Sequence, residues 1–113
     1  MSAASPQPLA AAPEEGLALT LDARDDVAVM TRPARRGEPV RICGAREGLT
    51  LTAATDLPTG HKIALHDLPV GKDVRKYGEI IGRMVAAASA GAHVHVHNLT
   101  GLRAAAPPAR TQE

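Results

Sequence analysis

Short apolar segments alternate with glycine-containing turns along the middle of the chain. The apolar segments are rich in Val, Ile, Leu and Thr, which favour extended backbone, and we predict each of them to be a β-strand. They cover residues 27–30, 39–43, 49–52, 62–66, 79–85 and 93–99. Glycines lie between or beside them at intervals of about ten residues, a spacing typical of a compact all-β domain. Residues 84–90 are also compatible with a helical turn, because alanine favours helices.

The two ends of the chain differ in composition from this middle region. Residues 1–18 are rich in Ala, Pro and Ser, and we expect them to be a disordered arm. Residues 103–113 contain two adjacent prolines and end in polar residues, which predicts a flexible tail. The sequence therefore predicts one domain over residues 19–102. Within it, the Asp56–Gly60 segment is echoed by Asp67–Gly71, which we interpret as two similar β-turns rather than a repeat architecture.

Composition narrows the possible function classes. The chain has 113 residues, a formal net charge of +1 and a single aromatic residue, Tyr77, so its core must be aliphatic. Few aromatic side chains and no excess of basic charge argue against nucleic-acid binding. Cys43 is the only cysteine, which excludes an intramolecular disulfide and fits a reducing compartment. Neither a secretory signal nor a membrane-spanning segment is recognisable, so we expect a cytoplasmic protein that does not associate with membranes.

Three histidines alternate with two valines in the segment 93–97. If this segment is an extended strand, His93, His95 and His97 line one face, while Val94 and Val96 pack inward on the other. Neighbouring imidazoles then lie about 7 Å apart, close enough for two of them to share a metal ion or an anionic substrate. Histidine also titrates nearest to neutral pH. The same pattern is compatible with the solvated face of an edge strand.

A second histidine lies where a predicted turn delivers a strand. Pro58 and Gly60 favour a tight bend, and His61 and Lys62 follow it directly. Polar side chains at the mouth of a turn on a rigid scaffold are often binding groups. A turn residue bonded to its own backbone, and a solvated cation, are the alternative interpretations of His61 and Lys62.

Four motifs in sequence order resemble one family. They are Asp25-Asp26-Val27-Ala28-Val29, then Asp56-Leu57-Pro58-x-Gly60-His61-Lys62-Ile63-Ala64-Leu65, then Lys76-Tyr77-Gly78-Glu79-x-Ile81-Gly82, then Gly91-x-x-Val94-His95-x-His97-Asn98. Together they are similar to the SAF domain of altronate and galactarate dehydratases, which also occurs as a separate small subunit, as in sulfolactate sulfo-lyase. Asp26 is a mild departure, since Asn is commoner there. The resemblance covers roughly residues 25–100.

The resemblance implies an all-β fold of the SAF or β-clip type. It also implies a small subunit of a carbon–oxygen lyase, a sugar-acid dehydratase, that acts with a separate large catalytic subunit and is inactive alone. Divalent iron is the implied cofactor, and a small hydroxy acid is the implied substrate. Two alternatives remain: the small subunit of a sulfolactate-type carbon–sulfur lyase, and a non-catalytic SAF-domain binding module.

The residues within these motifs receive roles by the same resemblance. Dehydration of a dihydroxy acid needs removal of a proton beside the carboxylate and assistance to the leaving hydroxyl. The expected catalytic residues are His61, His95 and His97, with His95 and His97 as metal ligands. The expected substrate-binding residues are Lys62, Lys76 and Asn98.

Other polar residues are given no part in the chemistry. The histidines of the family motif begin at His95, so His93 is expected to take less part than the other histidines of its segment, and His66 is expected on the surface. Asp25 and Asp26 precede a strand and are predicted to form a solvated turn. Purely structural roles are alternatives for the three expected catalytic histidines as well.

Overall fold

A computed structural model describes residues 15–101, which fold into β-strands joined by turns. The strands are β1 (Gly16–Thr20), β2 (Val27–Arg32), β3 (Pro39–Gly44), β4 (Leu49–Thr52), β5 (Lys62–Ala64), β6 (Asp73–Lys76), β7 (Glu79–Met84), β8 (His93–Val94) and β9 (Leu99–Gly101). The all-β prediction is confirmed, and no helix forms within residues 15–101, including at 84–90. The described part of the chain therefore also has no apolar helix long enough to cross a membrane.

The predicted boundaries need two corrections. β1 begins at Gly16, so the domain starts before residue 19, and the last residues of the predicted arm belong to it. The buried face of β1 carries only Gly16, Ala18 and Thr20, whose small side chains give a weak hydrophobic signal. The rest of the predicted arm, 1–14, and the predicted tail lie outside the described residues. β6 was not predicted either, because Val74 is its only apolar residue.

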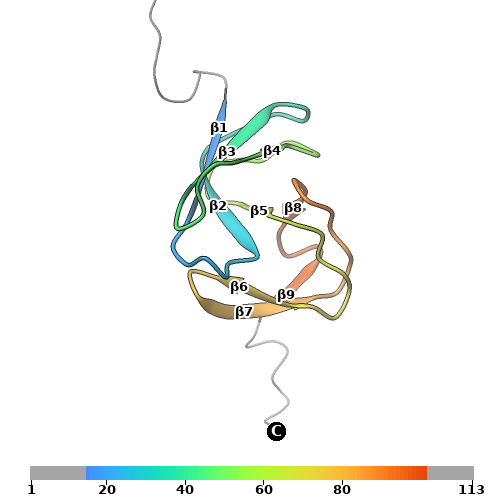
Figure 1. The fold of residues 1–113 in the computed structure, drawn as a ribbon. Helices are drawn as coiled ribbons and strands as arrows, with labels where there is room; N and C mark the ends of the chain where they lie inside the picture. The colour runs from blue at the N-terminus through green and yellow to red at the C-terminus, as the bar shows by residue number, and fades with distance from the viewer. Residues whose placement is uncertain (1–14, 102–113) are drawn as a thin grey trace, which may run out of the picture.

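The strands form two sheets, which Figure 1 shows one above the other. The larger has the order β4-β3-β1-β2-β5-β8, and the smaller has the order β6-β7-β9. β1 pairs with β3 in parallel, whereas the other pairings are antiparallel. β5 lies between β2 and β8, with Ile63 opposite both Ala28 and His93. This register brings the chain on either side of β5 against the histidine-rich segment.

Two clusters of small and aliphatic side chains form the core, as the composition predicts. One lies among β1, β2, β3 and β5, and its largest fully buried members are Met30, Ile42, Leu57 and Ile63. The other lies between the two sheets, with Leu68, Val74, Met84 and Val94 among its members. The core clusters contain no aromatic side chain, so burial of these aliphatic groups supplies most of the stabilisation of the domain.

Four turns share one construction and position the site. In each turn a buried apolar residue is followed, three positions later, by a glycine with φ of 88°. The pairs are Ala34 and Gly37, Leu57 and Gly60, Leu68 and Gly71, and Ala88 and Gly91. Bridges join the first turn to the second and the third to the fourth. The two turns recognised in the sequence therefore belong to different pairs, and glycine is required in each because φ is positive.

The second and fourth of these turns lead directly to histidines. His61 follows Gly60, and His93 lies two residues after Gly91. The amide of Gly60 donates to the Met30 carbonyl at 2.7 Å, and the amide of Gly91 donates to the Ala64 carbonyl at 2.8 Å. Both histidines thus leave turns that are tied to the central strands.

Candidate functional site

Three imidazole rings meet where β5 and β8 pair. Lys62 lies opposite Val94, and Ile63 opposite His93, so His61 and His95 flank the same end of the pairing. The ring centroids of His61 and His95 are 4.3 Å apart, and those of His61 and His93 are 4.9 Å apart. The rings of His93 and His95 lie 5.3 Å apart and are nearly parallel. We call His61, His93 and His95 the histidine cluster.

The ring nitrogens of the histidine cluster point toward one another. Nδ1 of His61 lies 2.7 Å from Nε2 of His93, a hydrogen bond whose donor depends on the tautomers. One ring nitrogen from each histidine lies within 4.8 Å of the other two. Nδ1 of His95 is buried and has no hydrogen-bond partner among the described residues. A buried polar atom without a partner is costly, so this nitrogen indicates a place for a ligand.

The chain turns after Val94, so the predicted strand through residue 99 is wrong. The backbone amides of Asn98 and Leu99 both donate to the His95 carbonyl, at 3.0 and 2.9 Å. Val96 consequently lies at the surface with 81% of its area exposed, whereas Val94 is fully buried as predicted. The alternation of His and Val favours a strand, but the local hydrogen bonds of Asn98 favour a turn.

Asn98 holds this turn together. Its Oδ1 accepts from the His95 amide at 2.9 Å, and its Nδ2 donates to the His93 carbonyl at 2.9 Å. The side chain is nearly fully buried. Asn98 therefore positions the backbone of His93 and His95, and its substrate contact stays a prediction.

The structure rearranges the predicted roles of the histidines. It brings together His61 and His95, as predicted, but adds His93, to which sequence reasoning gave a lesser part. His97 is exposed and lies at the outer edge, with its ring 5.2 Å from that of His93. His97 lies outside the group of three close ring nitrogens, and the metal pair of His95 and His97 stays a prediction. The register between β5 and β8, which determines the rings that lie together, cannot be read from the local motif.

Two lysines add positive charge beside the cluster. Lys62 is half-buried, and burial, followed by the charge of Lys76, lowers its pKa. Lys76 also lies over the Tyr77 ring, with Nζ 5.3 Å from the ring centroid. The two lysines predicted to bind substrate are therefore near each other, in an arrangement that suits an anionic group such as a carboxylate.

The surroundings of His93 and His95 favour the neutral form of both imidazoles. Burial and then the neighbouring His61 lower the pKa of both His93 and His95, and Lys62 lowers each further. Neutral imidazole is the form that accepts a proton or binds a metal ion. The three nitrogens also satisfy the chemistry of a divalent transition metal such as Fe²⁺ or Zn²⁺, for which imidazole is a suitable ligand. The histidine cluster therefore fits the implied metal.

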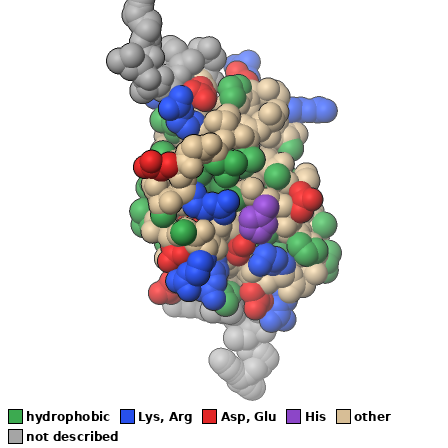
Figure 2. Space-filling view, in the orientation of Figure 1, with side chains coloured by type: hydrophobic (Ala, Val, Ile, Leu, Met, Phe, Trp, Pro, Cys, Tyr) green, Lys and Arg blue, Asp and Glu red, His purple; other side chains and the backbone are tan. Residues whose placement is uncertain are grey.

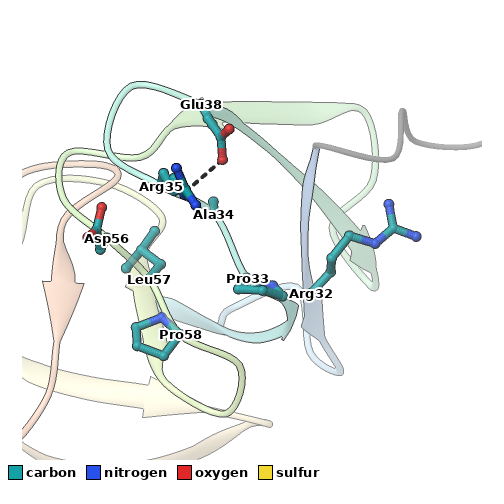
Figure 3. A pocket seen from close by; sticks show the side chains of 8 residues that line it. All are labelled: Arg32, Pro33, Ala34, Arg35, Glu38, Asp56, Leu57 and Pro58. Atoms are coloured by element: carbon teal, nitrogen blue, oxygen red, sulfur yellow. Dashed lines mark hydrogen bonds between the residues drawn. The ribbon is translucent and has the colours of Figure 1, made fainter.

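Surface hollows support this location only in part. A hollow of about 410 Å³ borders His93, His97 and Asn98. A larger one, about 520 Å³, lies away from the histidines between the turns at Ala34 and Leu57, and Figure 3 shows Arg32 extending away from its other labelled side chains. The two carboxylates that line the larger hollow, Glu38 and Asp56, each accept a hydrogen bond from a backbone amide. Since three ring nitrogens converge in the histidine cluster, we assign the site to that cluster.

Asp25 and Asp26 are buried, which contradicts the predicted solvated turn. Asp25 accepts from the backbone amides of Leu21, Asp22 and Gly78, at 3.2, 3.2 and 2.8 Å. Because Gly78 lies far along the chain, the sequence around the two aspartates does not show that they are covered.

Asp26 makes its contacts with the smaller sheet and the loop after β5. It accepts from the Arg75 amide at 2.8 Å, and it lies 2.9 Å from Nε2 of His66 and 3.6 Å from Nζ of Lys72. His66 remains partly exposed, as predicted, but has this ion-pair partner. We call Asp25 and Asp26 the aspartate pair, and its contacts link the start of β2 to the β6–β7 hairpin.

The face of the molecule drawn in Figure 2 carries acidic and basic side chains interspersed. Positive and negative charges are therefore mixed over that face.

Comparison with known proteins points to one group. A model of the family described as altronate/galactarate dehydratase SAF domain matches residues 17–102. The (2R)-sulfolactate sulfo-lyase subunit alpha of Paracoccus pantotrophus is 56% identical over 48 residues, which are 42% of this chain and 72% of that subunit. The corresponding subunit of Chromohalobacter salexigens is 49% identical over 43 residues, 38% of this chain and 46% of the relative.

A much longer enzyme is also similar. The altronate dehydratase of Escherichia coli is 39% identical over 80 residues, which are 71% of this chain but 15% of that enzyme. The chain thus spans most of one sulfo-lyase alpha subunit and only a small part of altronate dehydratase.

Proposed function

This chain belongs to the altronate/galactarate dehydratase SAF-domain family, and from that premise we propose that it is the small subunit of a lyase. Its partner is a separate large catalytic subunit that corresponds to the part of altronate dehydratase outside the matched region. The names of the two sulfo-lyase relatives, each a subunit alpha, support a division of the enzyme between chains. The convergence of three imidazoles beside two lysines is the observation that carries a catalytic rather than a purely structural role.

The proposed reaction is the dehydration of a sugar acid. A proton is removed from the carbon beside the carboxylate, and a hydroxyl leaves from the next carbon as water. An imidazole, from His61 or His95 of the histidine cluster or from His97 at its outer edge, accepts or returns a proton. Lys62 and Lys76 hold the substrate carboxylate. A divalent metal, which the family resemblance gives as Fe²⁺, supplies Lewis-acid polarisation of substrate oxygens when bound.

A sulfolactate-type sulfo-lyase is the second candidate. It is favoured by the 56% identity to a sulfo-lyase subunit alpha, over most of that subunit. The proton removal is the same, but the bond that breaks is carbon–sulfur and the leaving group is sulfite. The two lysines suit either substrate, because both carry a carboxylate. The free thiol of Cys43 agrees with a cytoplasmic location for either enzyme.

Reconstitution tests the proposal. The full chain is co-expressed with a large subunit encoded beside it, and the complex is screened with sugar acids and with sulfolactate, with and without added ferrous iron. We expect turnover of one substrate class by the complex and none by the isolated chain, because 113 residues are too few to enclose a sugar acid and complete a metal shell. Turnover by the purified chain alone would contradict the subunit role, and a binding-module role follows if the large subunit is fully active without this chain.

A matched pair of variants separates the chemistry from the scaffold. His95→Ala is expected to lower turnover of the complex by at least about 100-fold, as for loss of an acid–base group. His66 contacts Asp26 and is not part of the histidine cluster. His66→Ala is therefore expected to leave turnover within about threefold of the unchanged chain. Equal turnover in both variants would remove the histidine cluster from the mechanism.

A further inference from the structure

We infer that His61, His93 and His95 form a three-nitrogen site for one divalent transition-metal ion, with His93 rather than His97 as the third ligand. The inference names the ligands of the metal in the proposed function and rests on that function only for the role of the ion in turnover. The site itself is argued from the geometry of the described residues.

The spacing of the ring nitrogens is close to what an ion requires. One nitrogen from each of the three histidines lies within 4.8 Å of the others. The centre of a triangle with sides of that length lies about 2.8 Å from each corner, and metal–imidazole bonds are about 2.1 Å long. Small rotations of three partly exposed side chains are therefore sufficient to close the site around an ion.

The hydrogen bond between His61 and His93 does not block this site. Nδ1 of His61 and Nε2 of His93 face each other at 2.7 Å, so one of them carries a proton. A neutral imidazole that moves this proton to its other ring nitrogen exposes a lone pair on the facing one, with no net loss of a proton. Two facing nitrogens are thereby available to one ion.

The unpartnered nitrogen of His95 is an independent observation that points to a ligand. Nδ1 of His95 is buried and lacks a hydrogen-bond partner within residues 15–101. Leaving such an atom unpaired carries the full cost of removing it from water. A bound ion supplies a partner for a ring nitrogen at this position, whereas a solely structural packing role for His95 leaves the nitrogen unexplained.

The scaffold fixes the ligands before an ion arrives. Two tied glycine turns lead to His61 and His93, and the Asn98 side chain bonds the backbone of both His93 and His95. The structure thus assigns Asn98 to positioning the ligands.

The remaining coordination positions suit an anion. Three neutral nitrogens leave the full charge of a divalent ion uncompensated, and catalytic metal sites commonly combine three protein ligands with an open position. Lys62 follows His61 in the chain and lies opposite Val94, the residue between His93 and His95, in the pairing of β5 with β8. This cation disfavours a second metal and favours a carboxylate as the next ligand of the first.

Metal titration of the full chain tests the inference without the large subunit. The chain, free of affinity tag, is stripped with a chelator and titrated with Zn²⁺ and with Fe²⁺ under anaerobic conditions, and binding is measured by calorimetry. Co²⁺ absorption in the visible range reports imidazole coordination directly. We expect one ion per chain and at least about a 100-fold loss of affinity in each of His61→Ala, His93→Ala and His95→Ala, equivalent to about 2.7 kcal/mol.

Two variants are matched controls. His97→Ala and His66→Ala are expected to bind the ion within about threefold of the unchanged chain. Thermal melting in the presence of chelator checks folding, and His93→Gln replaces His93→Ala if the smaller side chain unfolds the domain. No binding by the unchanged chain, or an equal loss in His97→Ala and His93→Ala, would overturn the inference. Metal binding as expected in a chain whose reconstituted complex has no lyase activity would leave the site standing and overturn the proposed function.

Discussion

Two polar clusters in this domain differ in how their atoms are satisfied. In the aspartate pair, the carboxylates accept hydrogen bonds from four backbone amides, those of Leu21, Asp22, Arg75 and Gly78, and Asp26 also contacts the side chains of His66 and Lys72. In the histidine cluster, a buried ring nitrogen has no partner, and the side chains that converge carry the same sign of charge when protonated.

This difference indicates that the aspartate pair belongs to the scaffold and the histidine cluster to the functional site. A buried carboxylate that is fully hydrogen-bonded stabilises the fold, because its partners are parts of the same chain. A cluster that leaves a donor or acceptor unused is stable only if something else completes it, and such clusters are typical of functional sites. We therefore expect mutations in the aspartate pair to change stability and mutations in the histidine cluster to change activity.

The largest loss of stability is expected for Asp25→Ala. The change removes the acceptor for three backbone amides that join the β1–β2 loop to Gly78. We expect a loss of about 3 kcal/mol in the free energy of unfolding, measured by urea denaturation, and a melting temperature lower by roughly 15 °C.

The exposed ion pair of Asp73 and Arg83 provides the control for this change. Asp73→Ala is expected to cost no more than about 0.5 kcal/mol, since exposed pairs contribute little. Equal effects of the two substitutions would show that burial of the aspartate pair does not determine its contribution.

A smaller effect, about 2 kcal/mol, is expected for Val94→Ala. Val94 is fully buried in the core cluster between the sheets, so the change removes buried area and leaves a cavity. Val96→Ala, two residues later, is expected to change unfolding by less than about 0.5 kcal/mol because Val96 is exposed. Equal losses of unfolding free energy in the two variants would indicate a continuous strand through Val96 and contradict the turn at the histidine cluster.

Asn98→Ala is expected to cost about 1.5 kcal/mol in unfolding free energy, through loss of its bonds to the His95 amide and the His93 carbonyl. Asn98→Asp keeps the acceptor but not the donor. Its unfolding free energy is expected to lie between those of Asn98→Ala and the unchanged chain. An unchanged denaturation midpoint in Asn98→Ala would show that the turn forms without this side chain.

The sequence predicted the strands whose apolar side chains are large. β2, β3 and β4 were placed within two residues of their ends, because Val, Ile and Leu recur there. β1 and β6 were not predicted. β1 buries only small side chains, and β6 has a single apolar residue. Strand existence is thus readable from local pattern only where burial requires bulky residues.

The sequence predicted that histidines form the site, but it did not show which histidine rings lie together. The glycine turn before His61 and the motif containing His95 marked two of the three converging rings. The place of His93 depends on the register between β5 and β8, and the hydrogen bonds of Asn98 turn the chain back on itself, so the local motif shows neither feature. Burial of the aspartate pair depends on the β6–β7 hairpin, about fifty residues away along the chain.

Turnover by the reconstituted complex that contains His93→Ala tests the central claim most directly, because local sequence pattern and three-dimensional geometry disagree about this residue. The account predicts a loss of at least about 100-fold in turnover, with a melting temperature of the isolated variant close to that of the unchanged chain. Full turnover in His93→Ala, under conditions where His95→Ala is inactive, would contradict it.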